Sequence, residues 1–126
     1  MFRIEFAKKQ AWENELDIPK CEILLEKIRE NFNVKIIEKY EIIFYLSLTG
    51  LYNAEDIAEI FGHSPKNINA DFNKNLGHYI RSYLELEDTD RVGITSIRRI
   101  LYKAGYFKEI YSPNPIINIR RTSKYW

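Results

Sequence analysis

The sequence predicts a mainly all-α fold built around a helix-turn-helix. Several stretches repeat apolar residues at helical spacing, and the chain around residue 60 carries start and stop signals for two successive helices. With 126 residues, of which 45% are apolar, the chain suits one domain with a real hydrophobic core. The prediction leaves room for a small β wing or for terminal strands beside the helices.

Residues 1–52 are predicted to form a helical support for the rest of the chain. The alternation of apolar and charged residues in Phe2–Phe6 indicates a short strand. Residues 7–17 have a helix-friendly composition, and Pro19 then interrupts the chain. Three residues of this first helix are expected to face inward: Ala11, Trp12 and Leu16.

Two further helices are predicted within this support. Residues 21–32 place apolar groups on one face and charges on the others. The inward residues are Cys21, Leu24, Leu25, Ile28 and Phe32. Residues 35–49 form the most hydrophobic element, so we expect this helix to lie at the centre and to stop at Gly50.

Residues 53–86 are predicted to form the helix-turn-helix. Asn53 is a favoured N-cap, and Gly62 can adopt the left-handed conformation that ends a helix. Ser64 caps the second helix, and Pro65 occupies its first position, where a missing N–H costs nothing. The second helix is expected to run unbroken from Pro65 to about Leu86. Six residues are expected to be buried together: Ile57, Ala58, Phe61, Ile68, Phe72 and Ile80.

This segment resembles the helix-turn-helix of LuxR-type effector domains and of sigma-factor region 4. In those families a run similar to I-A-x-x-L-x-x-S-P-x-T-V joins a supporting helix to a recognition helix, and residues 57–68 follow that spacing. His63 departs from the pattern, which usually has an apolar residue there. Residues 71–84 and 96–106 are more weakly similar to helix-turn-helix modules of large cyanobacterial signalling and conflict proteins. The resemblance implies DNA binding through the second helix.

The exposed side of the second helix is the predicted DNA-binding face. Asn can pair with adenine, and Lys can contact guanine or phosphate. Because the first turns of a recognition helix lie against the bases, the base-edge candidates are Lys66, Asn67, Asn69, Ala70 and Asn73. Residues further along suit backbone contacts: Lys74, His78 and Arg81. Asp71 is the one acid between Pro65 and Leu84, and it is expected either to accept from cytosine or to cap a local network.

The charge of the chain is unevenly distributed. Residues 1–90 carry 11 basic and 17 acidic residues, whereas residues 91–126 carry eight basic residues and one acidic residue. A basic block on an acidic body is the footprint expected for a polyanion partner. Residues 91–110 are predicted to contain a short basic helix whose Arg98, Arg99 and Lys103 share one side and contact phosphates. Residues 111–126 are predicted to form an extended basic tail, in which Arg120 and Arg121 reach DNA.

The sequence gives no sign of an enzyme. It contains no P-loop, no Rossmann glycine pattern and no zinc-ligand cluster, so no catalytic residue, metal or cofactor is expected. The lone Cys21 cannot form an internal disulfide and fits a reducing compartment. Since the chain also lacks a signal peptide and a membrane-spanning run, a cytoplasmic location without membrane contact is predicted.

Double-stranded DNA is therefore the predicted partner, bound by a transcriptional or mobile-element regulator. Assembly into a homodimer or into a larger protein complex is compatible with this prediction. The alternative is a protein-interaction adaptor that uses the same fold without binding DNA. The acidic first half of the chain suits the adaptor, because it would repel DNA if it lay beside the recognition helix.

Overall fold

The computed structural model describes residues 3–87 and 91–108, and within these ranges the fold is all-α, as predicted. The helices that support the rest are α1 (Ile4–Glu13), α2 (Ile18–Phe32) and α3 (Glu38–Leu48). They are followed by α4 (Ala54–Phe61), α5 (Pro65–Lys74), α6 (Leu76–Tyr83) and α7 (Ile97–Lys103). The described residues contain no strand, only an isolated bridge between Leu16 and Phe107.

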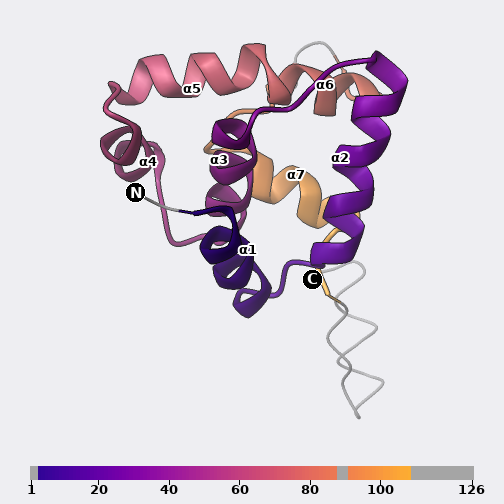
Figure 1. The fold of residues 1–126 in the computed structure, drawn as a ribbon, viewed down its shortest axis with the longest axis horizontal. Helices are drawn as coiled ribbons and strands as arrows, with labels where there is room; N and C mark the ends of the chain where they lie inside the picture. The colour runs from indigo at the N-terminus through magenta and orange to yellow at the C-terminus, as the bar shows by residue number, and fades with distance from the viewer. Residues whose placement is uncertain (1–2, 88–90, 109–126) are drawn as a thin grey trace.

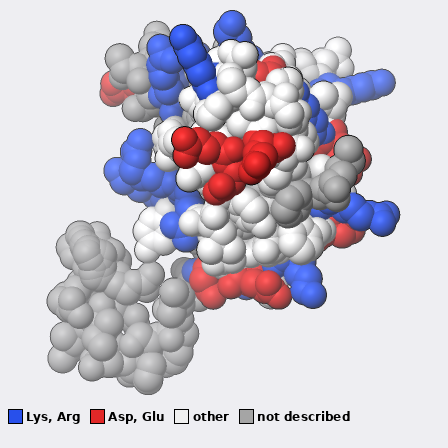
Figure 2. All heavy atoms as spheres, turned by 90° about the vertical axis from the view of Figure 1, so that its left-hand side faces the viewer, with Lys and Arg blue, Asp and Glu red and all other residues white. Residues whose placement is uncertain are grey.

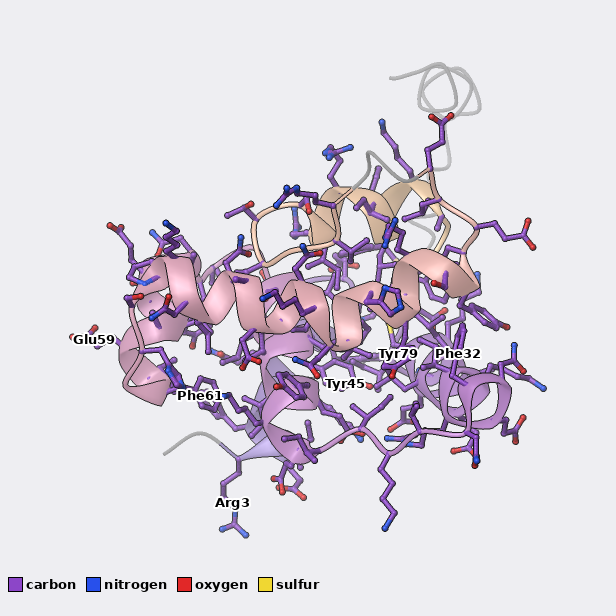
Figure 3. The ribbon with its side chains drawn as sticks, turned by 90° about the horizontal axis from the view of Figure 1, so that it is seen from above. Arg3, Phe32, Tyr45, Glu59, Phe61 and Tyr79 are labelled. Carbon is purple, nitrogen blue, oxygen red and sulfur yellow. The ribbon has the colours of Figure 1, made fainter. Side chains whose placement is uncertain are left out.

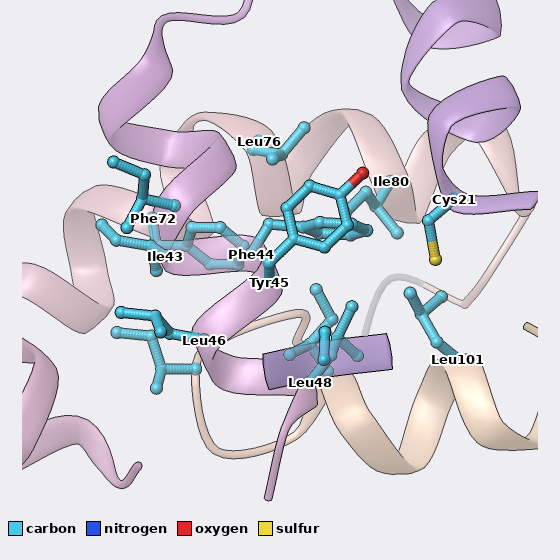
Figure 4. Close-up of a cluster of buried hydrophobic side chains, with 14 of the residues drawn as sticks. Cys21, Ile43, Phe44, Tyr45, Leu46, Leu48, Phe72, Leu76, Ile80 and Leu101 are labelled. Carbon is cyan, nitrogen blue, oxygen red and sulfur yellow. The ribbon is translucent and has the colours of Figure 1, made fainter. Parts of the chain in front are cut away.

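The centre of the molecule is α3, as its hydrophobicity predicts. Every residue from Ile42 to Leu48 is buried. In Figure 1 the other helices surround α3, and Figure 4 shows its side chains meeting those of α5, α6 and α7. The ring of Phe44 meets that of Tyr45 edge-on, with centroids 5.0 Å apart. Because α3 is covered on all sides, it fixes the positions of the helices packed against it.

The N-terminal segment differs from the prediction in two ways. The predicted strand at Phe2–Phe6 is wrong, since α1 begins at Ile4. Trp12 was expected to face inward, but it is 50% exposed, and the ammonium of Lys108 lies 3.3 Å from its ring centroid. The buried edge of α1 is made by Ala7 and Ala11, one turn apart, which places Trp12 about 100° away from that edge.

Helix α2 follows the predicted pattern closely. The carboxylate of Asp17 accepts a hydrogen bond from the backbone N–H of Lys20, and Pro19 lies in the first turn. Four of the five predicted inward residues are buried: Cys21, Leu24, Leu25 and Ile28. Phe32, the fifth, is half-buried, and its ring packs against that of Tyr79 with centroids 5.2 Å apart (Figure 3).

The local signals of the predicted helix-turn-helix form as expected. Asn53 and Asp56 make a capping box at the start of α4, and Gly62 ends that helix at φ 71°. Ser64 Oγ accepts a hydrogen bond from the N–H of Asn67 at the start of α5. Five of the six residues predicted to share a core are buried: Ile57, Ala58, Ile68, Phe72 and Ile80. Phe61 is only half-buried, because it lies in the last turn of α4, at the edge of this unit.

The helix predicted to run from Pro65 to Leu86 is broken at Asn75. The backbone there has φ −105° and ψ −100°, which separates α5 from α6. The Asn75 amide donates hydrogen bonds to the backbone oxygen of Asp71, at 2.8 Å, and to its carboxylate, at 3.0 Å. Asn side chains compete for backbone groups in this way and weaken a helix locally. As a result α5 is a short rod of ten residues, about 15 Å long.

The segment after α6 does not form a β wing in its described part. Residues 91–96 are a loop that leads into α7, and residues 88–90 lie outside the described ranges. The predicted extended tail, residues 111–126, also lies outside them. Among the described helices none is both long and apolar enough to cross a membrane.

Candidate nucleic-acid interface

A groove of about 560 Å³ lies between α5 and the segment 91–100, and it is called the basic groove below. Its α5 wall consists of Lys66, Asn69, Ala70, Asn73 and Lys74. Its other wall consists of Arg91, Gly93, Thr95, Ser96, Arg99 and Ile100. Each wall therefore brings two cations, and no described Asp or Glu lines the groove. Such a concentration of one charge attracts anions.

The α5 wall contains most of the residues predicted to contact DNA. Ile68 and Phe72 anchor the inner side of the helix and are fully buried. Ala70 lies near the middle of the opposite side, where its small side chain leaves room for close approach. The exposed residues around it are Lys66, Asn67 and Lys74, and Asn73 is half-buried at the edge of the groove.

The side chain of Asn69 contacts the loop that forms the opposite wall of the groove. Its side-chain oxygen accepts a hydrogen bond from the backbone N–H of Ile94, at 2.8 Å. Bidentate pairing with adenine requires both the oxygen and the nitrogen of the amide. Through this hydrogen bond Asn69 connects the two sides of the groove.

The loop wall is held together by Ser96. Its hydroxyl donates to the carbonyl of Arg91 at 2.6 Å and accepts from the N–H of Gly93 at 3.0 Å. Arg91, Thr95 and Ser96 are not among the site residues predicted from the sequence. The excess of basic residues after position 90 was the only signal for them, because their placement depends on how the loop packs against α5.

Arg98, Arg99 and Lys103 are all exposed on α7, but they have different surroundings. The Nε of Arg98 donates to the carbonyl of Leu48 at 3.3 Å, and its guanidinium lies 5.3 Å from the ring centroid of Phe107. Arg98 thus caps the carboxyl end of α3, where a cation is favourable. Arg99 lines the basic groove, whereas Lys103 is exposed one turn further along α7, outside the groove lining.

The remaining predicted contacts lie on α6 or outside the described residues. His78 is exposed and its ring lies 5.3 Å from that of Tyr79, but it does not line the basic groove. Arg81 is half-buried, with Nη2 3.5 Å from Nδ1 of His78. Gly77, on the same helix, is buried. Arg120 and Arg121 lie outside the described ranges.

An acidic surface lies on the neighbouring helix α4. Glu55, Asp56 and Glu59 are exposed there. Figure 2 looks onto the side of the molecule on which α4 lies, and it shows acidic side chains in the centre with basic ones above and to the left. In Figure 3, Glu59 points outward at the end of the molecule formed by α4. The two helices of the helix-turn-helix therefore carry surfaces of opposite charge.

Asp71 ties the second helix of this unit to α3. Its carboxylate accepts from the hydroxyl of Tyr40 at 2.8 Å and pairs with the ammonium of Lys39 at 3.1 Å. Partial burial raises the pKa of Asp71, but the hydrogen bonds from Tyr40 and Lys39 and the charge of Lys39 outweigh it, so the pKa falls below its usual 3.8. Of the two roles expected for Asp71, the structure shows the local network.

Asp71→Asn is expected to lower the free energy of unfolding at pH 7 by roughly 1 kcal/mol, because it weakens a half-exposed network. The folded pKa of Asp71 is depressed, so its contribution is complete above about pH 5 and is lost as the pH falls through the folded pKa. Urea unfolding at pH 7 and at pH 2.5 checks this. The difference between wild type and variant should shrink at pH 2.5, and an equal difference at both pH values would contradict the assignment.

No metal or redox chemistry is indicated by the described side chains. Among residues 3–87 and 91–108, no group of three or more His, Cys, Asp or Glu residues is placed to hold a metal ion. Cys21 is buried, and burial raises the pKa of its thiol to about 12. A thiol with such a pKa is a poor nucleophile at neutral pH.

Comparison of the chain with protein-family models, with curated proteins and with solved structures gave no match. Function must therefore be inferred from the residues themselves. The feature available for that inference is the basic groove beside the exposed face of α5.

Proposed function

We propose that the protein binds double-stranded DNA, with α5 in the major groove, and that it acts as a transcriptional or mobile-element regulator. One observation carries the proposal: the basic groove gathers four cations and no described acid along the exposed side of the second helix of a helix-turn-helix. Phosphate contacts from Lys and Arg supply most of the affinity in such complexes and position the helix on the duplex.

The composition of the groove favours a duplex over a single strand. Proteins that bind single strands usually stack the bases on aromatic side chains. None of the described residues that line the basic groove is aromatic. The major groove of B-DNA is about 12 Å wide and admits an α-helix. An exposed rod such as α5, with Ala70 at its centre, has a suitable size and surface.

The charge of α4 sets the side on which DNA approaches. In the usual docking geometry the first helix of the unit crosses the DNA backbone. Glu55, Asp56 and Glu59 would repel phosphates there. We therefore place the duplex toward the segment 91–99, with α4 tilted away from it.

The experiment is a fluorescence-anisotropy titration of a labelled random-sequence duplex at several salt concentrations. Four phosphate contacts predict a slope of log K against log [salt] of about −3.6, and thus roughly a hundredfold loss of affinity between 50 and 200 mM salt. Binding that is absent at 50 mM salt would contradict the proposal. Binding that does not depend on salt would contradict it as well.

A protein-interaction adaptor is the second candidate, favoured by the acidic surface of α4. A partner with a basic surface would complement Glu55, Asp56 and Glu59. This candidate predicts that the chain does not bind duplex DNA even at low salt. The titration at 50 mM salt therefore separates the two functions.

A further inference from the structure

We propose that the loop 91–96 together with Arg99 forms a phosphate clamp, assembled against α5 before DNA arrives, and that Asn69 is the residue that positions it. This inference rests on the proposed DNA binding and deepens it. In this proposal the basic groove binds the phosphodiester backbone of one DNA strand, and Asn69 does not contact the bases.

The clamp is held in place by buried side chains and by hydrogen bonds within the loop. Val92 and Ile94 are buried in the core, which leaves Arg91 and Thr95 exposed on the alternate positions of the loop. The hydroxyl of Ser96 closes the loop through its two short hydrogen bonds. Arg91 is therefore held by the hydrogen bond from Ser96 and by the buried Val92 that follows it.

The distance between the clamp and α5 is fixed by close contacts. The oxygen of Asn69 binds the N–H of Ile94 at 2.8 Å, and a Cβ added to Gly93 would lie 2.7 Å from that same oxygen. A Cβ on Gly77, in the neighbouring helix α6, would lie 2.1 Å from the carbonyl oxygen of Val92. The loop is thus held by the Asn69 side chain of α5 and packs tightly against the backbone of α6. A site assembled in advance binds without the cost of ordering its parts.

The chemistry of the clamp suits phosphate. Arg91 and Arg99 carry planar guanidinium groups, which can bind two phosphate oxygens at once, and Lys66 and Lys74 face them as point charges. Contacts of this kind carry no sequence information. We therefore expect the clamp to contribute equally to the binding of every duplex, while Asn67 and Ala70 on the outer face of α5 lie nearest the bases.

The charges are tested with Arg91→Gln and Arg99→Gln, and Lys9→Gln is the matched control because Lys9 is exposed on α1, away from α5. Each arginine variant should bind a random duplex roughly five- to tenfold more weakly at 100 mM salt, with a salt slope smaller by about one unit. Lys9→Gln should change neither. If wild type binds the duplex and the arginine variants have the same affinity and salt slope as Lys9→Gln, the clamp proposal is wrong, but the proposed DNA binding is not contradicted. Wild type that binds no duplex at low salt would overturn both.

The positioning role is tested without changing any charge. Asn69→Ala removes the hydrogen bond to Ile94, and Gly93→Ala places a Cβ 2.7 Å from the side-chain oxygen of Asn69, so that this amide has to move. Both substitutions should lower the affinity for an A·T-rich duplex and for a G·C-rich duplex by the same factor, roughly three- to tenfold. The affinities are measured at a temperature where circular dichroism shows both variants folded. A loss confined to the A·T-rich duplex would make Asn69 a base-reading residue. Unchanged affinity for both duplexes in the folded variants would make its role purely structural. Either result would overturn the proposal.

Discussion

Gly77→Ala is expected to lower the free energy of unfolding by about 2 kcal/mol or more, although alanine is the better helix former. In an exposed helix, replacing glycine with alanine would stabilise the folded protein by about 1 kcal/mol. In α6, however, the new Cβ would lie 2.1 Å from the carbonyl oxygen of Val92 and 3.1 Å from that of Phe72. Both neighbours are backbone atoms, so relief requires a shift of α6 or of the loop, and overpacking of this kind costs about 1–3 kcal/mol or more.

Thermal unfolding followed by circular dichroism measures this effect. About 1 kcal/mol moves the Tm of a domain of this size by roughly 4 °C, so the variant should melt about 8 °C or more below wild type. Ser82→Ala, at an exposed position of α6, is the control and should change stability by less than about 0.5 kcal/mol. A Gly77→Ala protein that melts at or above the wild-type temperature would show that α6 and the loop are not packed this closely.

Features specified by neighbouring residues could be predicted from the sequence. The capping box of Asn53 and Asp56, the left-handed Gly62 and the cap at Ser64 each depend on a few adjacent residues, and all of them form. The burial of Ile68 and Phe72 follows from helical spacing alone. The same spacing placed Lys66, Ala70 and Lys74 on the exposed side of the second helix.

Features that depend on distant partners could not be predicted in this way. The break at Asn75 coincides with the packing of Gly77 against Val92, fifteen residues away in sequence. Arg98 lies against the carboxyl end of α3, fifty residues before it, and this contact could not be predicted from helical spacing. Helical periodicity shows which residues share a face, but it does not show which element covers that face.

The same limit applies to the candidate site. Arg91 and Ser96 belong to a loop whose sequence has no periodicity, and their place in the basic groove follows from the hydrogen bond between Asn69 and Ile94. The amide of Asn69 was expected to face DNA because Asn is a common base-reading residue. Residue type could not distinguish that role from the contact it makes with the loop.

Ala70→Glu is expected to abolish DNA binding. In the proposed complex the exposed face of α5 contacts the phosphates and bases of the duplex, and Ala70 lies on that face. Ala70 is exposed near the middle of the face, so the longer side chain should fold without a clash. Glu is a good helix former, so little change in stability is expected. A carboxylate at this position would face the charge of DNA, and like charges brought together across an interface cost several kcal/mol.

Ala70→Gln is the matched control, because it has nearly the same size and no charge. The measurement is the affinity of wild type and both variants for one labelled duplex at 100 mM salt, with thermal unfolding to confirm that each is folded. We predict that Ala70→Glu binds roughly a hundredfold more weakly than Ala70→Gln. Equal affinity of the two variants for the duplex would show that DNA does not lie against α5, and would contradict the account.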